Sequence, residues 1–523
     1  MDRHVSSVTI FTSSLALTAI GIVCLGIYLL VDTWRYSLRE KALGCGRPNR
    51  LRNKLPYGID YLWTLQKADR ENRVPQQLLK ICRDVKSATF VQNLAGRDGI
   101  GTSDPKNIQA LLALQFKDFG LGSRRRQNFY PLLGNGIFTA DGEMWEHSRA
   151  ILRPQFSRGQ VSDLELEERH VQEMFNQLNV DASGWTSSVD LAPVFFRLTM
   201  DTATEFLFGE SVNSQRAHAL QHSSDLPVHD LRWSKVGANF DHGTATLGIR
   251  ARLEGLYWLY NPKSFREDIR EVHKFADHCI NQALKRRQMG SVKDQKKYIF
   301  LDQLLDVVND PAELRSQLLN IFLAGRDTTA GLLGWTFWCL ARHPGVYSKL
   351  RTSIVDQFGS SEREDTITFA GLKSCSYLQH VMNEVLRLYP SVPFNFRQAT
   401  RDTTLPRGGG PDESAPIYVK KDQSISYSVF VMHRRKDLWG ANADEFDPDR
   451  WVGRKTGWEY LPFNGGPRIC LGQQFALTEA GYVITRMVQR FEKISNTDPE
   501  DEPLQQYSLT SAPKSTWVRL YHG

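Results

Sequence analysis

The chain has 523 residues, of which 41% are hydrophobic, and a formal net charge of +7. No linker, internal repeat or long Ser-, Gly- or Pro-rich stretch divides it, so we expect one large domain rather than several of roughly 150 residues each. Lys and Arg are dispersed, whereas nucleic-acid binders gather them in blocks. The charge therefore argues against a nucleic-acid partner and favours an anionic membrane surface or an acidic protein partner.

The seven cysteines are odd in number and widely spaced, with no CxxC pair and no zinc-type spacing. A disulfide scaffold is not expected in a chain this large and cysteine-poor, so a reducing compartment fits best. The seven are Cys24, Cys45, Cys82, Cys279, Cys339, Cys375 and Cys470.

Residues 8–31 carry no charged side chain. Since about 20 apolar residues span the hydrocarbon of a bilayer as a helix, we expect a membrane anchor over residues 1–34, with its transmembrane part at about 8–31. A cleaved signal peptide is the alternative, but its apolar stretch would be shorter, about 7–15 residues, and would follow a basic segment. Here the basic residues come after the apolar stretch, which places the C-terminal side in the cytosol. Residues 35–60 form a basic, proline-containing connector, and residues 61–523 the globular domain.

Apolar periodicity predicts helices along most of that domain. Residues 76–122 mix short apolar runs with polar turns. Asp141 is suited to cap a helix that carries Trp145 and Arg149, four residues apart, on one face. Helical spacing of apolar residues recurs in three further segments, at 164–178, 189–208 and 264–287.

A long helix begins at Pro311, with Asp310 as its N-cap, and is stopped near His343 by Pro344. It would be about 50 Å long at 1.5 Å per residue, so it must cross the whole domain. Its apolar residues lie almost all round between positions 318 and 340, which predicts a buried position.

Two more helices are predicted at 378–388 and 476–491, and short strands at 417–419 and 424–430. The fold class that we expect is mainly α with small β-sheets.

The long helix carries the run Ala324-Gly-Arg-Asp327-Thr328-Thr329. A helical Thr usually returns its hydroxyl to the carbonyl one turn back, and an Asp usually lies on a solvated face. Here an acid and two hydroxyls interrupt a helix that we expect to be buried, where unpaired polar groups cost several kcal/mol. Ala324 and Gly325 leave room for a flat ligand.

Glu384 and Arg387 stand three residues apart and share one helix face. On a surface such a pair is common and contributes only a few tenths of a kcal/mol, so it carries little information by itself.

Cys470 stands in the run Phe463-Asn-Gly-Gly-Pro-Arg-Ile-Cys-Leu-Gly472. Most buried cysteines act as small hydrophobes, but glycines without a Cβ allow a bulky cofactor to approach a thiolate closely. The whole pattern, Phe-x-x-Gly-x-Arg-x-Cys-x-Gly, resembles the haem-ligand loop of the cytochrome P-450 family. The resemblance implies haem b with Cys470 as the axial iron ligand, and a thiolate ligand favours O–O cleavage because it pushes electron density onto the metal.

The resemblance runs in family order from Trp145 to Gly472 and assigns further roles. The run at 324–329 matches the oxygen-activation motif, which implies that Ala324 borders the haem and that Asp327 and Thr328 form the catalytic pair. Haem propionates need cationic partners. The cofactor-binding residues that the resemblance implies are Trp145, Arg149, Ala324, Arg397, Phe463, Arg468, Cys470 and Gly472.

Glu384, Arg387 and Arg450 are implied to form a buried structural network. The implied fold is a triangular helical prism around the long central helix, preceded by one N-terminal transmembrane helix. The family branch implies a single-pass protein of the endoplasmic reticulum membrane with a cytosolic catalytic domain. Electrons would come from NADPH through NADPH–cytochrome P-450 reductase, an acidic flavoprotein that suits the net basic charge. Membrane lipid and an apolar small molecule are the other implied partners.

Three stretches, at 133–149, 395–410 and 461–470, look like the fungal branch that hydroxylates n-alkanes and fatty acids at the chain end. A linear substrate needs a long apolar channel, and four apolar residues lie in segments that would line one. The residues 124–126, all Arg, could hold a carboxylate at the mouth, although a solvated loop is the simpler interpretation. The four apolar residues are Leu121, Phe129, Phe394 and Phe396.

Two alternatives stay open. Similar fungal sequences act as tailoring oxidases of polyketide, terpenoid or fatty-acyl metabolites. A haem protein that binds a ligand without catalysis is the other alternative, but it would not need Asp327 and Thr328, so the intact pair argues against it.

Overall fold

Residues 2–94, 96–156, 164–220, 232–289, 298–360 and 367–523 are described by the computed structural model. Helices dominate and the strands are short, which confirms the predicted class of mainly α with small β-sheets. The helices of the domain are α2 (Ile59–Arg70), α3 (Val74–Val85), α4 (Pro105–Gln109), α5 (Ser123–Leu133), α6 (Gly142–Leu152), α7 (Leu164–Phe175), α8 (Leu191–Phe208), α9 (Ser214–Leu220), α10 (Val236–Arg252), α11 (Lys263–Gln288), α12 (Phe300–Leu304), α13 (Pro311–Arg342), α14 (Pro344–Phe358), α15 (Phe369–Ser374), α16 (Ser376–Leu388), α17 (Val429–Met432), α18 (Lys436–Trp439) and α19 (Gln473–Arg490).

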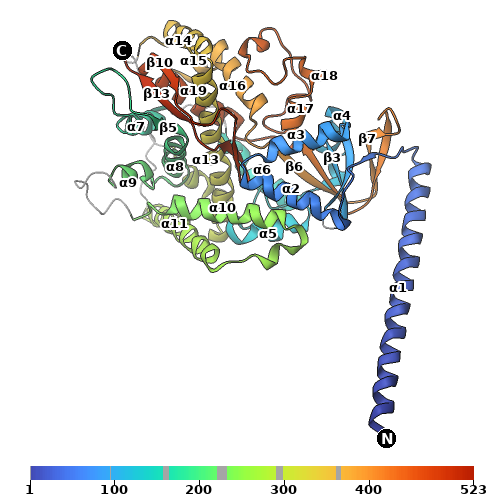
Figure 1. The fold of residues 1–523 in the computed structure, drawn as a ribbon. Helices are drawn as coiled ribbons and strands as arrows, with labels where there is room; N and C mark the ends of the chain where they lie inside the picture. The colour runs from blue at the N-terminus through green and yellow to red at the C-terminus, as the bar shows by residue number, and fades with distance from the viewer. Residues whose placement is uncertain (1, 95, 157–163, 221–231, 290–297, 361–366) are drawn as a thin grey trace.

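The strands form small sheets beside the helical body (Figure 1). The largest sheet has the order β1-β2-β3-β9-β6-β4, and the smaller ones are β10-β13-β5, β11-β12 and β7-β8. The strands are β1 (Asn49–Arg50), β2 (Thr89–Leu94), β3 (Arg97–Thr102), β4 (Phe119–Gly120), β5 (Val189–Asp190), β6 (Phe394–Ala399), β7 (Thr403–Gly409), β8 (Ala415–Val419), β9 (Ser424–Ser428), β10 (Lys493–Asn496), β11 (Gln505–Tyr507), β12 (Ser511–Pro513) and β13 (Trp517–Tyr521).

The long helix α13 begins and ends as the sequence predicts. The Asp310 carboxylate accepts the Ala312 N–H at 3.0 Å, and Pro311 occupies the first turn. His343 leaves the helical conformation because Pro344 disfavours it in the preceding residue. In Figure 1, α13 runs through the middle of the domain. Its N-terminal half packs into the core formed with α5, α8, α10, α11 and α12, and its C-terminal half into the core formed with α7, α14, α16 and α19.

One predicted strand is shorter than expected. β9 stops at Ser428 rather than at residue 430, because the Ser428 hydroxyl accepts the Val431 N–H at 3.2 Å and caps α17. This turn directs the chain toward His433, which lies completely buried next to the Cys470 loop.

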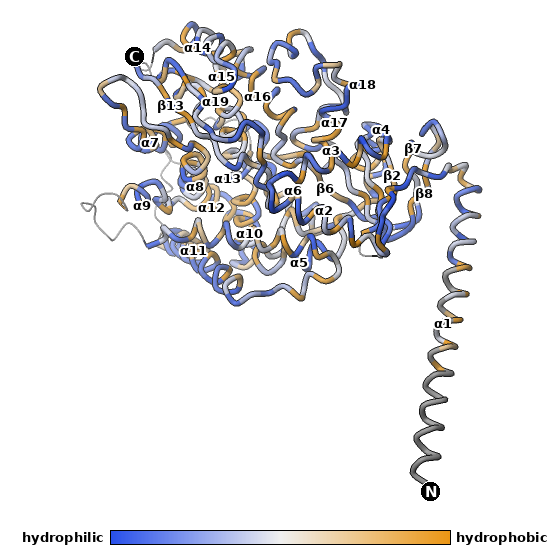
Figure 2. Tube along the Cα trace, in the orientation of Figure 1, coloured by the Kyte–Doolittle hydropathy of each residue, from blue (hydrophilic) through white to orange (hydrophobic). Residues whose placement is uncertain are grey.

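The N-terminal helix α1 (Asp2–Ala42) projects away from the body (Figure 1). Its C-terminal part contacts the β7-β8 hairpin, where Asp32 pairs with Lys420 at 2.6 Å. Figure 2 shows apolar positions along the described part of α1, and several of its large apolar side chains are exposed, among them Leu17 and Leu30. In the part of the chain that the structure describes, no helix is long and apolar enough to cross a membrane.

Candidate active site

A cavity of about 1370 Å³ brings most of the predicted site residues together. α13 forms one wall, and the segment 463–472, with Cys470, forms the opposite wall. The cavity lining includes Trp145, Arg149, Ala324, Thr328, Arg397, Phe463, Arg468, Cys470 and Gly472.

Backbone hydrogen bonds fix the Cys470 loop. The Cys470 N–H donates to the Phe463 carbonyl at 3.0 Å, and Arg149 donates to the Ile469 carbonyl at 3.1 Å. Gly466 adopts φ +67°, and an added Cβ there would lie 1.9 Å from the Leu112 carbonyl oxygen, so this position requires glycine.

The exposed surface of Cys470 faces the cavity, and the surrounding protein otherwise encloses the residue. Burial raises the pKa of the thiol, while the Gly472 N–H and the Arg149 charge act in the opposite direction. Both interactions stabilise the anionic form, which is the form that binds a metal.

On the opposite wall, the hydroxyl of Thr328 donates to the Ala324 carbonyl at 2.6 Å. This is the bond that a Thr in a helix ordinarily makes. An added Cβ at Gly325 would meet nothing within 4 Å, so the space beside it is open. This wall therefore presents Thr328, with Thr329 beside it, and a patch almost without side chains to the cavity.

Asp327 faces away from that cavity. It lines a second cavity of about 610 Å³ together with Asp241 and Arg326. Arg326 donates to Asp327 at 3.1 Å and to Asp241 at 3.0 Å. Burial raises the pKa of Asp327 to about 6, although the Arg326 charge opposes the shift. The predicted catalytic pair is thus divided between the two cavities.

Arg468 lies at the edge of the large cavity, over the ring of Trp145 at 4.4 Å. It donates to the Asp141 carboxylate at 2.6 Å. Its Nε is buried and has no hydrogen-bond partner among the described residues, and burial lowers the pKa of the guanidinium to about 9. Arg397, 2% exposed, donates to the Phe396 carbonyl at 2.8 Å.

Asp141 differs from its predicted role. It stands before α6, but its carboxylate makes no cap hydrogen bond. Instead it accepts the backbone N–H groups of Leu121 and Gly122, at 2.8 and 3.0 Å, as well as Arg468. The carboxylate therefore joins the chain before α5 to the edge of the cavity.

Arg125 is indicated by the sequence only as a possible carboxylate-binding residue, and a solvated loop is the simpler interpretation. It lies on α5, not in a solvated loop, and it lines the large cavity. It donates to the Phe138 carbonyl and to Asn395 Oδ1, both at 3.1 Å. Burial, and to a lesser extent Arg397, lower its pKa to about 10. The spacing of Arg125 and Phe129, which puts them on one helix face at 5.3 Å, is the signal that could have revealed it.

These donors fit haem. Several arginines line the cavity, and Asp141 is the carboxylate that Arg468 contacts. Since the Arg468 Nε lacks a partner within the described chain, the edge suits a further anion such as a propionate. A thiol stands on one wall and a nearly bare helix surface on the other, as a flat, thiolate-ligated ring requires. The arginines of the lining that bear on haem are Arg125, Arg149, Arg397 and Arg468.

Glu384, Arg387 and Arg450 meet behind the cysteine loop. Glu384 and Arg387 are 0% exposed and joined by two hydrogen bonds of 2.7 and 2.8 Å. Arg450 reaches the same carboxylate at 3.3 Å, and the Trp451 indole N–H donates to it at 3.0 Å. The three residues therefore form a buried network that does not line the cavity.

His433 connects this network to the loop, and no sequence pattern marks it. Its Nε2 accepts the Leu461 N–H at 3.0 Å, so its Nδ1 donates to the Arg387 carbonyl at 3.1 Å. Burial lowers its pKa to about 3, which keeps the ring neutral.

Known proteins resemble the chain over nearly its whole length. A profile of the family described as Cytochrome P450 matches residues 54–519. Cytochrome P450 monooxygenase g430 of Fusarium sp is 50% identical over 474 residues, which cover 89% of this chain and 82% of that protein. Cytochrome P450 52A13 of Debaryomyces hansenii is 48% identical over 452 residues, 86% of each chain.

Cytochrome P450 monooxygenase alt2 of Alternaria solani is 44% identical over 512 residues, 94% of each chain. These relatives are fungal, as the resemblance to a fungal branch predicts. The chain therefore belongs to the cytochrome P450 family, and it is an oxidoreductase of the monooxygenase class.

Proposed function

We propose that the protein hydroxylates the terminal carbon of fatty acids or n-alkanes, inserting one oxygen atom of O2 into an unactivated C–H bond. Electrons come from NADPH through NADPH–cytochrome P-450 reductase. The observation that supports this function is the large cavity, which continues from Cys470 and Thr328 along apolar side chains as far as the exposed Trp63 and Leu256. A long apolar channel with few polar groups suits a linear substrate.

Four apolar residues predicted to border the substrate do line this cavity, namely Leu121, Phe129, Phe394 and Phe396. Phe206, Leu207 and Leu332 continue the apolar lining. These side chains exclude water and hold a flexible chain through dispersion contacts alone.

Haem, when bound, supplies the oxygen chemistry. Cys470 would hold its iron, with the Gly472 N–H and Arg149 stabilising the thiolate. Arg397 and Arg468 would bind the propionates, and Trp145 supports Arg468 through its ring face. Phe463 and Ala324, which line the cavity, would contact the haem.

Proton delivery uses both sides of α13. The Thr328 hydroxyl turns from the Ala324 carbonyl to donate into the large cavity. Asp327 takes up protons from the second cavity, because a carboxyl with a pKa of about 6 exchanges a proton readily near neutral pH. Asp327 must leave Arg326 to pass that proton on, so we assign Arg326 and Asp241 a positioning role.

We further propose that residues 1–34 anchor the protein in the endoplasmic reticulum membrane as a single pass, with the catalytic domain in the cytosol. The uncharged run 8–31 lies within α1, whose exposed apolar side chains favour lipid. The basic residues that follow it favour the cytosolic side. In this arrangement, residues 35–60 connect the anchor to the haem domain at 61–523.

The test is reconstitution of the full chain with the reductase, NADPH and either lauric or palmitic acid, with products identified by mass spectrometry. Terminal hydroxy acids support the proposal. Turnover of cyclic metabolites but of no linear chain would indicate a tailoring oxidase instead. A thiolate-type carbon monoxide spectrum without turnover of any substrate would indicate a haem protein that only binds ligands.

A further inference from the structure

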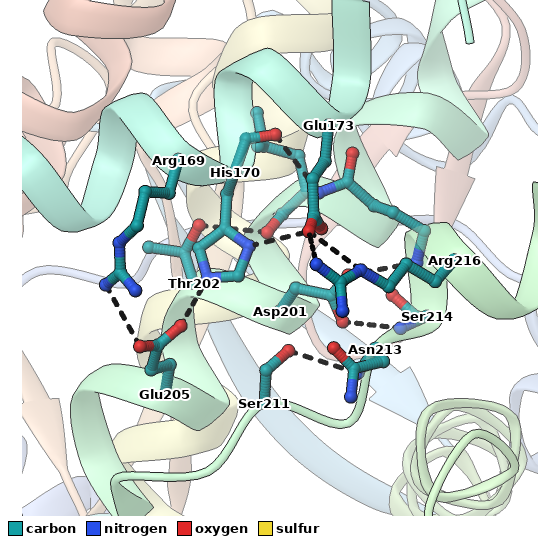
Figure 3. Close-up of polar contacts among 12 residues, drawn as sticks. Arg169, His170, Glu173, Asp201, Thr202, Glu205, Ser211, Asn213, Ser214 and Arg216 are labelled. Carbon is teal, nitrogen blue, oxygen red and sulfur yellow. Dashed lines mark hydrogen bonds and ion pairs between the residues drawn. The ribbon is translucent and has the colours of Figure 1, made fainter. Parts of the chain in front are cut away.

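Three side chains that could bind a metal ion meet where α7 packs against α8 (Figure 3). His170 and Glu173 stand on α7, three residues apart and so on one helix face, and Asp201 stands on α8. One nitrogen or oxygen of each lies within 4.8 Å of the others. None of the three residues lines the large cavity or the second cavity.

His170 is the best-defined member. The residue is 5% exposed, and its Nε2 lies 2.8 Å from Glu205 Oε2. Its Nδ1 points toward Glu173 Oε2 at 3.9 Å, which is too long for a hydrogen bond. This buried Nδ1 has no hydrogen-bond partner among the described residues. A buried polar atom without a hydrogen-bond partner destabilises the fold, so a ligand at this point is favoured.

The two carboxylates are each held from outside the cluster. Arg216 donates to Glu173 Oε1 at 2.9 Å, whereas the buried Oε2 has no hydrogen-bond partner within the described chain. Asp201 accepts the backbone N–H groups of Ser214 and Gln215 at 2.6 and 2.9 Å. A carboxylate oxygen that accepts one N–H still has a lone pair available. The outer hydrogen bonds thus orient the carboxylates without saturating them.

The guanidiniums near the cluster contact the outer oxygens of the carboxylates, so the inner ligand atoms stay open to a cation. Glu173, Asp201 and Glu205 carry three negative charges, and Arg216 and Arg169 bind the outer oxygens of Glu173 and Glu205. Arg197, the other nearby cation, lies on the α8 side, next to Asp201. The guanidiniums do not occupy the space between His170 Nδ1 and Glu173 Oε2, and a protonated His170 would make no hydrogen bond across 3.9 Å.

We propose that His170 Nδ1, Glu173 Oε2 and the Asp201 carboxylate bind one Zn²⁺ ion that joins α7 to α8 and, through Asp201, to α9. One imidazole and two carboxylates are ligands that zinc accepts in four-coordinate sites, with water in the fourth position. The Glu205–His170 contact is the carboxylate–histidine arrangement that orients metal-binding imidazoles. None of the three ligands lines either cavity, although Ser214, which donates to Asp201, lines the second one. The ion therefore stabilises the fold and takes no part in oxidation.

The experiment uses the full haem-loaded chain, stripped of metals with a chelator and then supplied with one equivalent of Zn²⁺ or Mg²⁺. We expect one zinc ion per chain by elemental analysis and a melting temperature higher by about 2 °C or more, since binding to the native state alone stabilises it. Mg²⁺ should give neither result, because it prefers all-oxygen ligands.

His170→Gln and Glu173→Gln should lose both the bound zinc and the zinc-dependent rise. The matched control is His278→Gln, because His278 pairs with Glu210 at 3.7 Å but belongs to no three-membered cluster of this kind in the described chain. The readout is the change that zinc produces within each variant, so a variant of lower intrinsic stability remains informative. Zinc binding that survives His170→Gln, or no stabilisation of the wild-type chain, would overturn the proposal.

Discussion

The two walls of the large cavity use buried polar groups in opposite ways. Behind Cys470, Glu384 and Arg387 are fully buried, and all their charged atoms have partners. On α13, Thr328 has one hydrogen bond to its own helix, and Asp327 is held by the adjacent Arg326. The first wall fixes atoms in place, whereas the second keeps polar groups that can change partners. The comparison suggests that supporting residues have partners for all their hydrogen-bonding groups, whereas residues that move protons keep some groups free to change partners.

Behind Cys470, every N–H donor of Arg387 has an acceptor. Its Nε and one Nη2 N–H donate to Glu384, and the other Nη2 N–H donates to the Glu445 carbonyl. Its Nη1 donates to the carbonyls of His433 and Ala443, at 2.8 and 2.5 Å. Since a guanidinium has five N–H donors, each has an acceptor.

Arg387→Ala should produce the largest effect. It removes the closer of the two arginines from the buried Glu384 carboxylate, which keeps only Arg450, and leaves three buried carbonyls without this donor. Such a change costs about 3–5 kcal/mol. We expect the soluble haem-loaded protein to be lost or to unfold at much lower urea concentration. The matched control is Arg83→Ala, because Arg83 makes an exposed pair with Asp444 and should cost about 1 kcal/mol or less. Equal urea midpoints for the two variants would contradict a supporting role for the network.

Cys470→Ala tests the residue of this wall that faces the cavity, and it should destabilise the fold less than Arg387→Ala. The loop is held by backbone hydrogen bonds, so we expect the chain to fold while the thiolate signature of the reduced carbon monoxide spectrum disappears. Cys375→Ala, which alters a buried cysteine of the core, should keep that signature. An unchanged spectrum in Cys470→Ala would mean that another residue holds the iron.

Much of this wall could be predicted because its pattern is local. The glycine at 466 is needed for a close backbone approach, and the arginine and cysteine follow within four residues. α13 was equally predictable, since Asp310 and Pro311 mark its start and Pro344 its end. In both cases the residues that decide the structure are neighbours in the sequence.

The residues that could not be predicted depend on distant partners. His433 bonds to Arg387, 46 positions earlier, and Asp141 bonds to Leu121 and Arg468 rather than capping its own helix. The division of Asp327 from Thr328 had a local cause, because consecutive helical residues point about 100° apart. Which of the two faces the haem is decided by the packing of α13 against its neighbours.

Thr328→Ala is the third test and concerns the cavity wall formed by α13. The variant should keep the haem and the stability but lose the hydroxyl that donates into the cavity, so NADPH is consumed with release of peroxide. Loss of a positioned proton donor should lower product per NADPH by at least about tenfold. Thr336→Ala is the matched control, because its hydroxyl makes the same bond, to Leu332 at 2.8 Å, outside the cavity. Full coupling in Thr328→Ala would remove the proposed role.

Asp327→Asn should leave the haem in place and show its effect mainly in the dependence of stability on pH. Burial raises the pKa of Asp327 to about 6 in the folded protein, so the unfolded chain releases this proton at lower pH than the folded one. Wild-type stability therefore falls as pH rises from about 4 to about 6, by on the order of 2–3 kcal/mol for this group. Asn does not titrate, so the stability of the variant relative to the wild type should rise over that pH interval.

Urea unfolding at pH 4 and pH 7 measures this gain as the change in the stability difference between Asp327→Asn and the wild type. Asp310→Asn, at the exposed N-cap of the same helix, is the control. Asn caps a helix about as well as Asp, so this variant should show no comparable gain between the two pH values. A difference for Asp327→Asn that stays constant would mean that Arg326 keeps the carboxylate ionised throughout. Asp327 would then belong with the saturated, supporting groups, and proton delivery would fall to Thr328 and the solvent of the large cavity.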